Sequence, residues 1–182
     1  MIHTTKPVVN KCLGKGAPIL DPRTLRLSKY LLPTVPLAPK RVNYSQGINV
    51  WPMYGNDQTG DCTIAASAHH VECWTNKSKG SPDLMSNASI LKAYEDVGGY
   101  VPGDPSTDNG CFMLDVLNYW RKTGIGGHKI DAYVSVDPMN HEEMAQAIWL
   151  FGGVYLGLNP WEDAERAFRA VLEIDSDSAA AS

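Results

Sequence analysis

Cys62 is the residue whose type and surroundings best suit chemistry. It stands in the run Gly60-Asp61-Cys62-Thr63, where apolar residues begin to recur at helical spacing. The N-terminus of a helix offers unpaired N–H groups and a partial positive charge, and both stabilise a thiolate. The same N–H groups can receive the oxyanion of a tetrahedral intermediate, which contributes about 10²–10³ in rate per donor. The pattern indicates a nucleophilic thiol, and a buried cysteine that merely packs remains the alternative.

The segment that leads to Cys62 reads Trp51-Pro52-Met53-Tyr54-Gly55-Asn56-Asp57-Gln58-Thr59-Gly60-Asp61. This run resembles the start of a mature papain-like cysteine peptidase, in which an extended strand leads to a glutamine, a short loop and the catalytic cysteine. Asn56 lies where that family places its oxyanion-hole glutamine, and Gln58 lies two residues closer to Cys62. The resemblance therefore implies Asn56 or Gln58 as the oxyanion donor.

The resemblance extends over residues 42–158. The run Asp108-Asn109-Gly110-Cys111 is similar to the family's Gly-rich turn, and the segment 141–155 is similar to the one before its catalytic histidine. The family's usual cysteine partner for that turn is absent near Cys62, which implies that Cys111 is a free thiol. Within this family, the residue pattern is most similar to that of uncharacterised papain-like proteins of bacterial and phage genomes. The resemblance implies a hydrolase, a thiol protease, that acts on a peptide or protein substrate.

A catalytic base is the missing part of this pattern. A papain-like site needs a histidine roughly 130–150 residues after its cysteine, and no histidine follows His141. His69 and His70 share the predicted helix with Cys62 and lie about 10 Å further along its axis, too far to reach the thiol. His128, in a Gly-rich turn, and His141, in a first helical turn, are freer. We therefore expect weak or absent activity, with His128 retained as a candidate base.

Capping signals and apolar spacing predict the elements that position these residues. Alternating residues over 130–136 predict a half-buried strand, and 154–158 reads as a buried strand. Asn140 with Glu143 has the pattern of a capping box. Helices come first and strands late, which favours an α+β fold over a doubly wound α/β sheet. The predicted helices span 62–74, 89–97, 113–122, 140–151 and 159–174.

The chain divides into three regions by composition. Residues 1–41 form a Pro-rich, extended arm with eight Lys and Arg against one Asp, whereas the rest of the chain holds eight against nineteen acidic residues. A basic arm can bind nucleic acid, but this one has no aromatic stacking platform. The favoured interpretation is an arm lying on its own acidic domain. Residues 42–159 form the cysteine-peptidase-like domain, and 160–182 an amphipathic helix.

The C-terminal helix, from Trp161 to Asp175, resembles the second helix of a tetratricopeptide repeat. It covers half a repeat, and at least about three repeats are needed to bury a core. An ordinary amphipathic helix explains the pattern equally well. The change of pattern after Leu158 suggests that a truncated peptidase-like sequence is joined there to unrelated sequence. We therefore expect a papain-like fold that is incomplete in its C-terminal strand half.

Composition excludes several classes of protein. No apolar run of about 18 residues could span a membrane, and the N-terminus has no apolar signal core, which indicates the cytoplasm. Four cysteines without CxxC spacing argue against a zinc site or a disulfide framework, so no cofactor or metal is predicted. Two functions remain open. One is a cysteine-peptidase-like hydrolase, and the other is a non-catalytic binding or structural protein that uses the cleft beside Cys62 or the arm. The substrate and the oligomeric state stay open.

Overall fold

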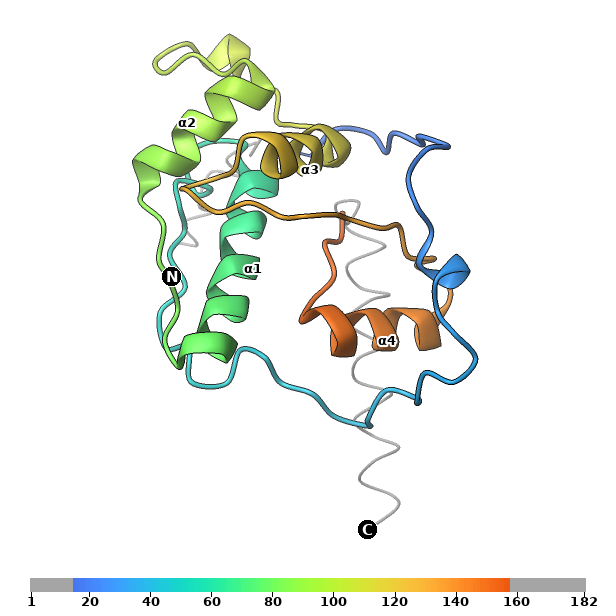
Figure 1. The fold of residues 1–182 in the computed structure, drawn as a ribbon. Helices are drawn as coiled ribbons and strands as arrows, with labels where there is room; N and C mark the ends of the chain where they lie inside the picture. Colours follow the sequence, from blue (N-terminus) through green and yellow to red (C-terminus); the bar gives the residue numbers. More distant parts are fainter. Residues whose placement is uncertain (1–14, 158–182) are drawn as a thin grey trace, which may run out of the picture.

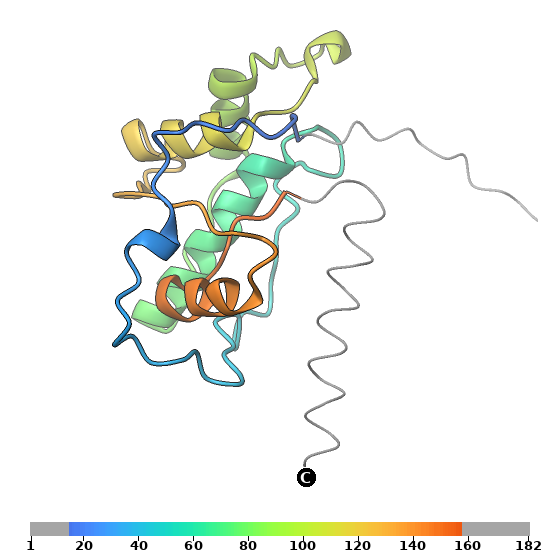
Figure 2. The same cartoon turned by 90° about the vertical axis from the view of Figure 1, so that its right-hand side faces the viewer.

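The computed structural model describes residues 15–157 of the chain (Figures 1 and 2). The predicted helix from Asn159, the C-terminal half repeat and the first fourteen residues of the arm lie outside this range. Within it the regular elements are helical. They are the 3₁₀ helix η1 (Leu27–Lys29), α1 (Cys62–Lys79), α2 (Asn87–Gly98), the 3₁₀ helix η2 (Pro105–Thr107), α3 (Met113–Lys122) and α4 (His141–Phe151).

The four predicted helices that fall inside the described range are confirmed. The start of α1, both ends of α3 and the end of α4 stand at the expected residues, whereas α1 runs on past residue 74 to Lys79. Three of these helices end on a glycine with positive φ: Gly80 at 80°, Gly99 at 69° and Gly152 at 81°. Glycine has no Cβ to clash in this left-handed conformation, which is why it ends a helix at little cost.

The predicted capping box at the start of α4 is half formed. The side chain of Asn140 accepts a hydrogen bond from the Glu143 N–H at 3.1 Å. The Glu143 carboxylate does not return to Asn140, whose own N–H already donates to the Asp137 carbonyl at 3.0 Å. Glu143 is buried and instead accepts from the Ser28 N–H at 3.2 Å. The residue therefore joins α4 to η1 rather than closing its own helix.

The expected α+β fold is wrong, and with it the papain-like fold, because residues 15–157 form no β-sheet. The alternating segment 130–136 makes a single bridge, between Ser135 and Arg26. Two backbone bonds flank that bridge: Leu27 N–H to the Ser135 carbonyl at 2.9 Å and Ser135 N–H to the Leu25 carbonyl at 2.7 Å. On the side of Leu27 the pairing stops where η1 begins. Residues 154–157 also lack strand pairing. The alternation over 130–136 therefore reflects a partly buried segment that has no partner strand.

The core lies between α1, α2 and α3, which contact one another (Figure 1). Ile64 and Ala68 of α1, Ile90 of α2 and Val116 of α3 are fully buried there. The helix α4 contacts η1 (Figure 1). The Trp74 side chain of α1 also donates to the Phe151 carbonyl at the end of α4, at 2.7 Å. No helix within residues 15–157 has both the length and the apolar character needed to cross a bilayer.

The described part of the basic arm, residues 15–41, passes over the domain (Figure 2). The Gly16 N–H donates to the Cys111 carbonyl at 2.9 Å, close to the turn before α3. Further along, Arg26 forms its bridge to Ser135, and η1 contacts α4. The arm thus contacts the turn that contains Cys111 near its first described residues, and α4 through η1.

Candidate thiol site

Cys62 is the first residue of α1, and its side chain is half-buried. Asp61 is the N-cap residue, as predicted, but its side chain makes no capping hydrogen bond. The Asp61 carbonyl instead accepts from the N–H groups of Ile64, at 2.8 Å, and Ala65, at 3.0 Å. The helix start is therefore held through the backbone, and the Asp61 carboxyl is directed elsewhere.

The Asp61 carboxyl is buried, with 1% of the residue exposed. Its Oδ1 atom has no hydrogen-bond partner within the described part of the chain. Loss of hydration raises the pKa of this carboxyl from 3.8 to about 7, and the negative charges of Asp108 and Asp57 add to the rise. A group that titrates near neutral pH therefore lies immediately before the thiol.

Asp108 ties the loop before Cys62 to the turn before α3. Its Oδ1 accepts hydrogen bonds from the Gly60 N–H, at 2.8 Å, and from the Tyr94 hydroxyl, at 2.5 Å. The Tyr94 oxygen in turn accepts from the Gly110 N–H at 2.8 Å. Burial raises the pKa of Tyr94, so the phenol stays protonated and remains a donor. The sequence pattern did not point to this clamp, because its members come from three separate segments.

The two other described cysteines have raised thiol pKa values, although Cys73 is half-buried like Cys62. Cys111 is a buried free thiol with 4% exposure, and burial raises its pKa to about 11. Burial and the neighbouring charge of Glu72 raise the pKa of Cys73 as well. A thiol with a raised pKa holds little thiolate at neutral pH and reacts slowly. Of the three cysteines in the described range, Cys62 alone combines a helix N-terminus with partial exposure.

The last described residues return to the start of α1. The Tyr155 hydroxyl donates to the Thr63 carbonyl at 2.7 Å, and burial raises the pKa of this phenol. Two residues later, Gly157 lies so close that a Cβ there would stand 2.5 Å from the Lys15 side chain and 2.6 Å from Met113 Sδ. Both ends of the described chain therefore approach the thiol site. Residue spacing alone contains no signal for this convergence.

The two predicted oxyanion donors, Asn56 and Gln58, lie in the loop before Cys62. Their backbone N–H groups donate within the loop, Asn56 to the Met53 carbonyl at 3.0 Å and Gln58 to the Gly55 carbonyl at 2.8 Å. Asn56 is half-buried and Gln58 is exposed. Neither side-chain amide makes a hydrogen bond to another of the described residues, so no such bond orients either amide towards Cys62.

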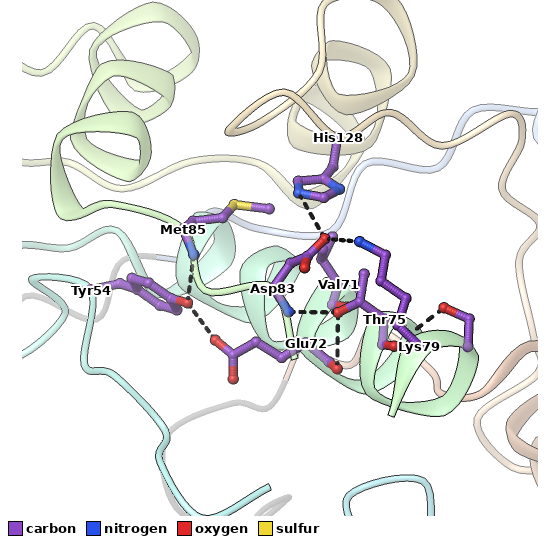
Figure 3. A network of polar contacts seen from close by, with 9 residues as sticks. Tyr54, Val71, Glu72, Thr75, Lys79, Asp83, Met85 and His128 are labelled. Atoms are coloured by element: carbon purple, nitrogen blue, oxygen red, sulfur yellow. Dashed lines mark hydrogen bonds and ion pairs between the residues drawn. The ribbon is translucent and has the colours of Figure 1, made fainter. Parts of the chain in front are cut away.

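His128, the predicted candidate base, lies beside the other half of α1 (Figure 3). Its Nε2 is 4.0 Å from Asp83 Oδ2. The Asp83 N–H donates to the Thr75 hydroxyl at 2.8 Å. Thr75 follows Cys62 by 13 residues, about 20 Å along the helix axis. The structure does not bring His128 to the thiol.

The remaining described histidines also lie away from the start of α1. His69 Nε2 is 3.0 Å from the Pro52 carbonyl, and His70 Nδ1 is 3.0 Å from the Ala66 carbonyl. Burial lowers the pKa of His70, which keeps that ring neutral. His141 is exposed at the first position of α4. Among residues 15–157, no group of three or more acidic, cysteine or histidine side chains is arranged to hold a metal ion.

No protein-family model, curated protein or solved structure matches this chain. The resemblance to papain-like peptidases gains no support from these comparisons. A function must therefore be argued from the geometry at the start of α1.

Proposed function

We propose that the chain is a thiol-dependent hydrolase of the cysteine-peptidase kind, with Cys62 as its nucleophile and with weak or absent turnover. The contrast among the described thiols carries this proposal. Cys62 is half-buried at a helix N-terminus, whereas burial raises the pKa values of Cys73 and Cys111. A helix N-terminus stabilises a thiolate, and the thiolate is the form that attacks an acyl carbon.

The proposed reaction is attack of the Cys62 sulfur on the acyl carbon of a peptide or protein substrate. The first N–H groups of α1 would receive the oxyanion, and Asn56 or Gln58 could add a donor from the preceding loop. Breakdown of the intermediate requires a proton for the leaving amine. A general acid–base group contributes about 10²–10⁴ in rate. His69 and His70 lie about 10 Å further along α1, and His128 lies beside Asp83. This is why we expect slow turnover.

The placement of the histidines favours a second candidate function, a non-catalytic binding or structural protein. His128 faces Asp83, and His69 and His70 contact backbone carbonyls. Side chains held in this way serve the fold. In this candidate the loop before Cys62 and the docked arm form a binding surface, and the thiol is reactive but takes part in no turnover.

A panel of fluorogenic peptides, assayed beside Cys62→Ala, His128→Ala and His141→Ala, separates the two candidates. We expect no measurable turnover of amides and slow, Cys62-dependent acylation by an activated ester. Robust amide turnover lost in Cys62→Ala and in one histidine variant would establish an active peptidase and identify its base. Acylation that persists in Cys62→Ala would contradict the proposed nucleophile.

A further inference from the structure

The Asp61 carboxyl differs from the carboxyl beside it in its hydrogen bonding. Asp108 Oδ1 accepts from two donors, the Gly60 N–H and the Tyr94 hydroxyl. Asp61 has 1% exposure, and its Oδ1 has no partner among residues 15–157. A buried carboxylate with an oxygen that lacks a donor is costly, so a protonated acid is the form that suits this position. Asp61 thus places a proton-dependent charge in the interior, one residue before the thiol in the chain.

The groups that face Asp61 are mostly acidic. Asp57 comes from the same loop and Asp108 from the turn before α3, and both charges act on Asp61. The charge of Asp61 also contributes to the raised pKa of Cys111, which lies in that turn. The Thr59 hydroxyl is the side chain that hydrogen-bonds to the Asp61 carboxyl and partly offsets these charges. Neighbouring negative charges and burial act in the same direction and favour neutral Asp61 at moderately acidic pH.

We infer that Asp61 is a positioning residue for Cys62, whose change from neutral acid to carboxylate limits the reactivity of the adjacent thiol as pH rises. This inference rests on the proposed role of Cys62 as a nucleophile. A negative charge close to a thiolate disfavours it, and this charge opposes the partial positive charge of the helix N-terminus. Neutral Asp61 leaves the effect of the helix intact. Ionised Asp61 cancels part of it.

The consequence is a particular pH profile. The rate of alkylation of an ordinary thiol rises about tenfold per pH unit until the thiol is ionised. The pKa of Asp61, raised to about 7 by burial, puts the onset of its charge inside that rise. The rate at Cys62 should therefore climb less steeply around neutral pH than the rate at a cysteine without such a neighbour.

The test is the rate of iodoacetamide alkylation at Cys62, read by mass spectrometry from pH 5.5 to 8.5, in the full chain and in Asp61→Asn. The ratio of the variant rate to the native rate should be close to one at pH 5.5 and about 3- to 10-fold at pH 8. Asp131→Asn is the control, because Asp131 is an exposed carboxylate that is not among the charges acting on Asp61. Its ratio should be the same at both pH values.

A ratio for Asp61→Asn that does not change with pH would overturn the inference, while selective alkylation of Cys62 would still support the proposed nucleophile. If another cysteine reacts faster than Cys62, the proposed function fails instead. Asp108→Asn keeps the test decisive should Asp61→Asn fail to fold. This variant retains an oxygen acceptor for Gly60 and Tyr94 but removes a negative charge beside Asp61. The pH at which the Cys62 alkylation rate begins to climb less steeply, here called the break, should therefore move to a lower value. An unmoved break would contradict the inference.

Discussion

The carboxyl groups at the two ends of α1, Asp61 and Asp83, lie in opposite environments. At the N-terminal end Asp61 is buried, with an oxygen that lacks a partner within the described part of the chain. Past the C-terminal end Asp83 is partly exposed and pairs with Lys79 at 2.5 Å and with His128 at 4.0 Å (Figure 3). Solvent screens the charges of the Asp83 pairs, whereas the protonation state of buried Asp61 changes near neutral pH. The comparison shows that Cys62 and the candidate base His128 lie in separate environments, about 20 Å apart along α1.

The middle of α1 shows a third arrangement, in which a buried carboxyl has a dedicated donor. Glu72 is fully buried, and its Oε1 accepts a hydrogen bond from the Tyr54 hydroxyl, while its Oε2 has no partner among the described residues. The Tyr54 oxygen accepts in turn from the Met85 N–H at 3.2 Å (Figure 3). Tyr54 has a positive φ of 56°, uncommon for a residue with a side chain. This network links the loop before Cys62 to the segment before α2.

The largest effect should come from Asp61→Asn measured as stability against pH. The folded-state pKa of about 7 lies above the ordinary value of 3.8, so the contribution of Asp61 is full below pH 3.8 and is lost as pH rises towards 7. The loss is roughly 3–4 kcal/mol. Urea unfolding at pH 4 and pH 8 should show the variant gaining about that much relative to the native chain. A difference independent of pH would contradict the burial of an acid at this position.

Tyr54→Phe should cost about 1.5–3 kcal/mol, because it leaves the Glu72 carboxyl buried without its donor. Tyr119→Phe is the matched control, since its hydroxyl donates to Asp96 on the surface at 2.8 Å. That variant should lose well under about 1 kcal/mol. Urea midpoints measure both. Equal losses would mean that the buried pair is no stronger than the exposed one.

Asn140→Ala removes a side-chain cap and should cost about 0.5–2 kcal/mol. The loss arises because the Asn140 oxygen accepts from the Glu143 N–H at the start of α4. Ser86→Ala removes the equivalent cap of α2, where the serine oxygen accepts from the Ser89 N–H at 3.1 Å, and should lose a similar amount. Chemical denaturation of each variant checks this. Unchanged midpoints in both would mean that these caps contribute nothing.

The smallest effect is expected at the exposed end of α1. Lys79→Ala breaks the pair with Asp83, which is partly solvent-exposed, and should cost about 0.2–1 kcal/mol. High salt should shrink the difference further, because screening weakens exposed pairs. A loss of several kcal/mol that persists in high salt would show that this end of α1 is not governed by solvent.

Helix positions were predictable because their signals are local. Gly99 and Gly152 end α2 and α4, and Asn140 begins α4, each through bonds within a few residues. The predicted strand at 130–136 failed because alternation reports half-burial, whereas a sheet needs a partner, and Arg26 supplies one bridge only. A single sequence contains little information about such distant partners.

The candidate site divides in the same way. Cys62 at a helix start follows from neighbouring residues, and the structure places it there. The clamp at Asp108, the return of Tyr155 and the burial of Asp61 depend on how separate segments meet. His128 is the opposite case. The sequence allowed it as a candidate base, whereas the tertiary structure places it beside Asp83.

The most direct test of the account compares alkylation of the cysteines in the folded full chain near pH 7.5, by limited iodoacetamide labelling and mass spectrometry. Cys62 should react at least about tenfold faster than Cys73 and Cys111, whose thiols have raised pKa values. In denaturant the rates should converge, because the helix N-terminus and the burial are both lost. Faster labelling of Cys12, Cys73 or Cys111 than of Cys62 in the folded chain would contradict the account.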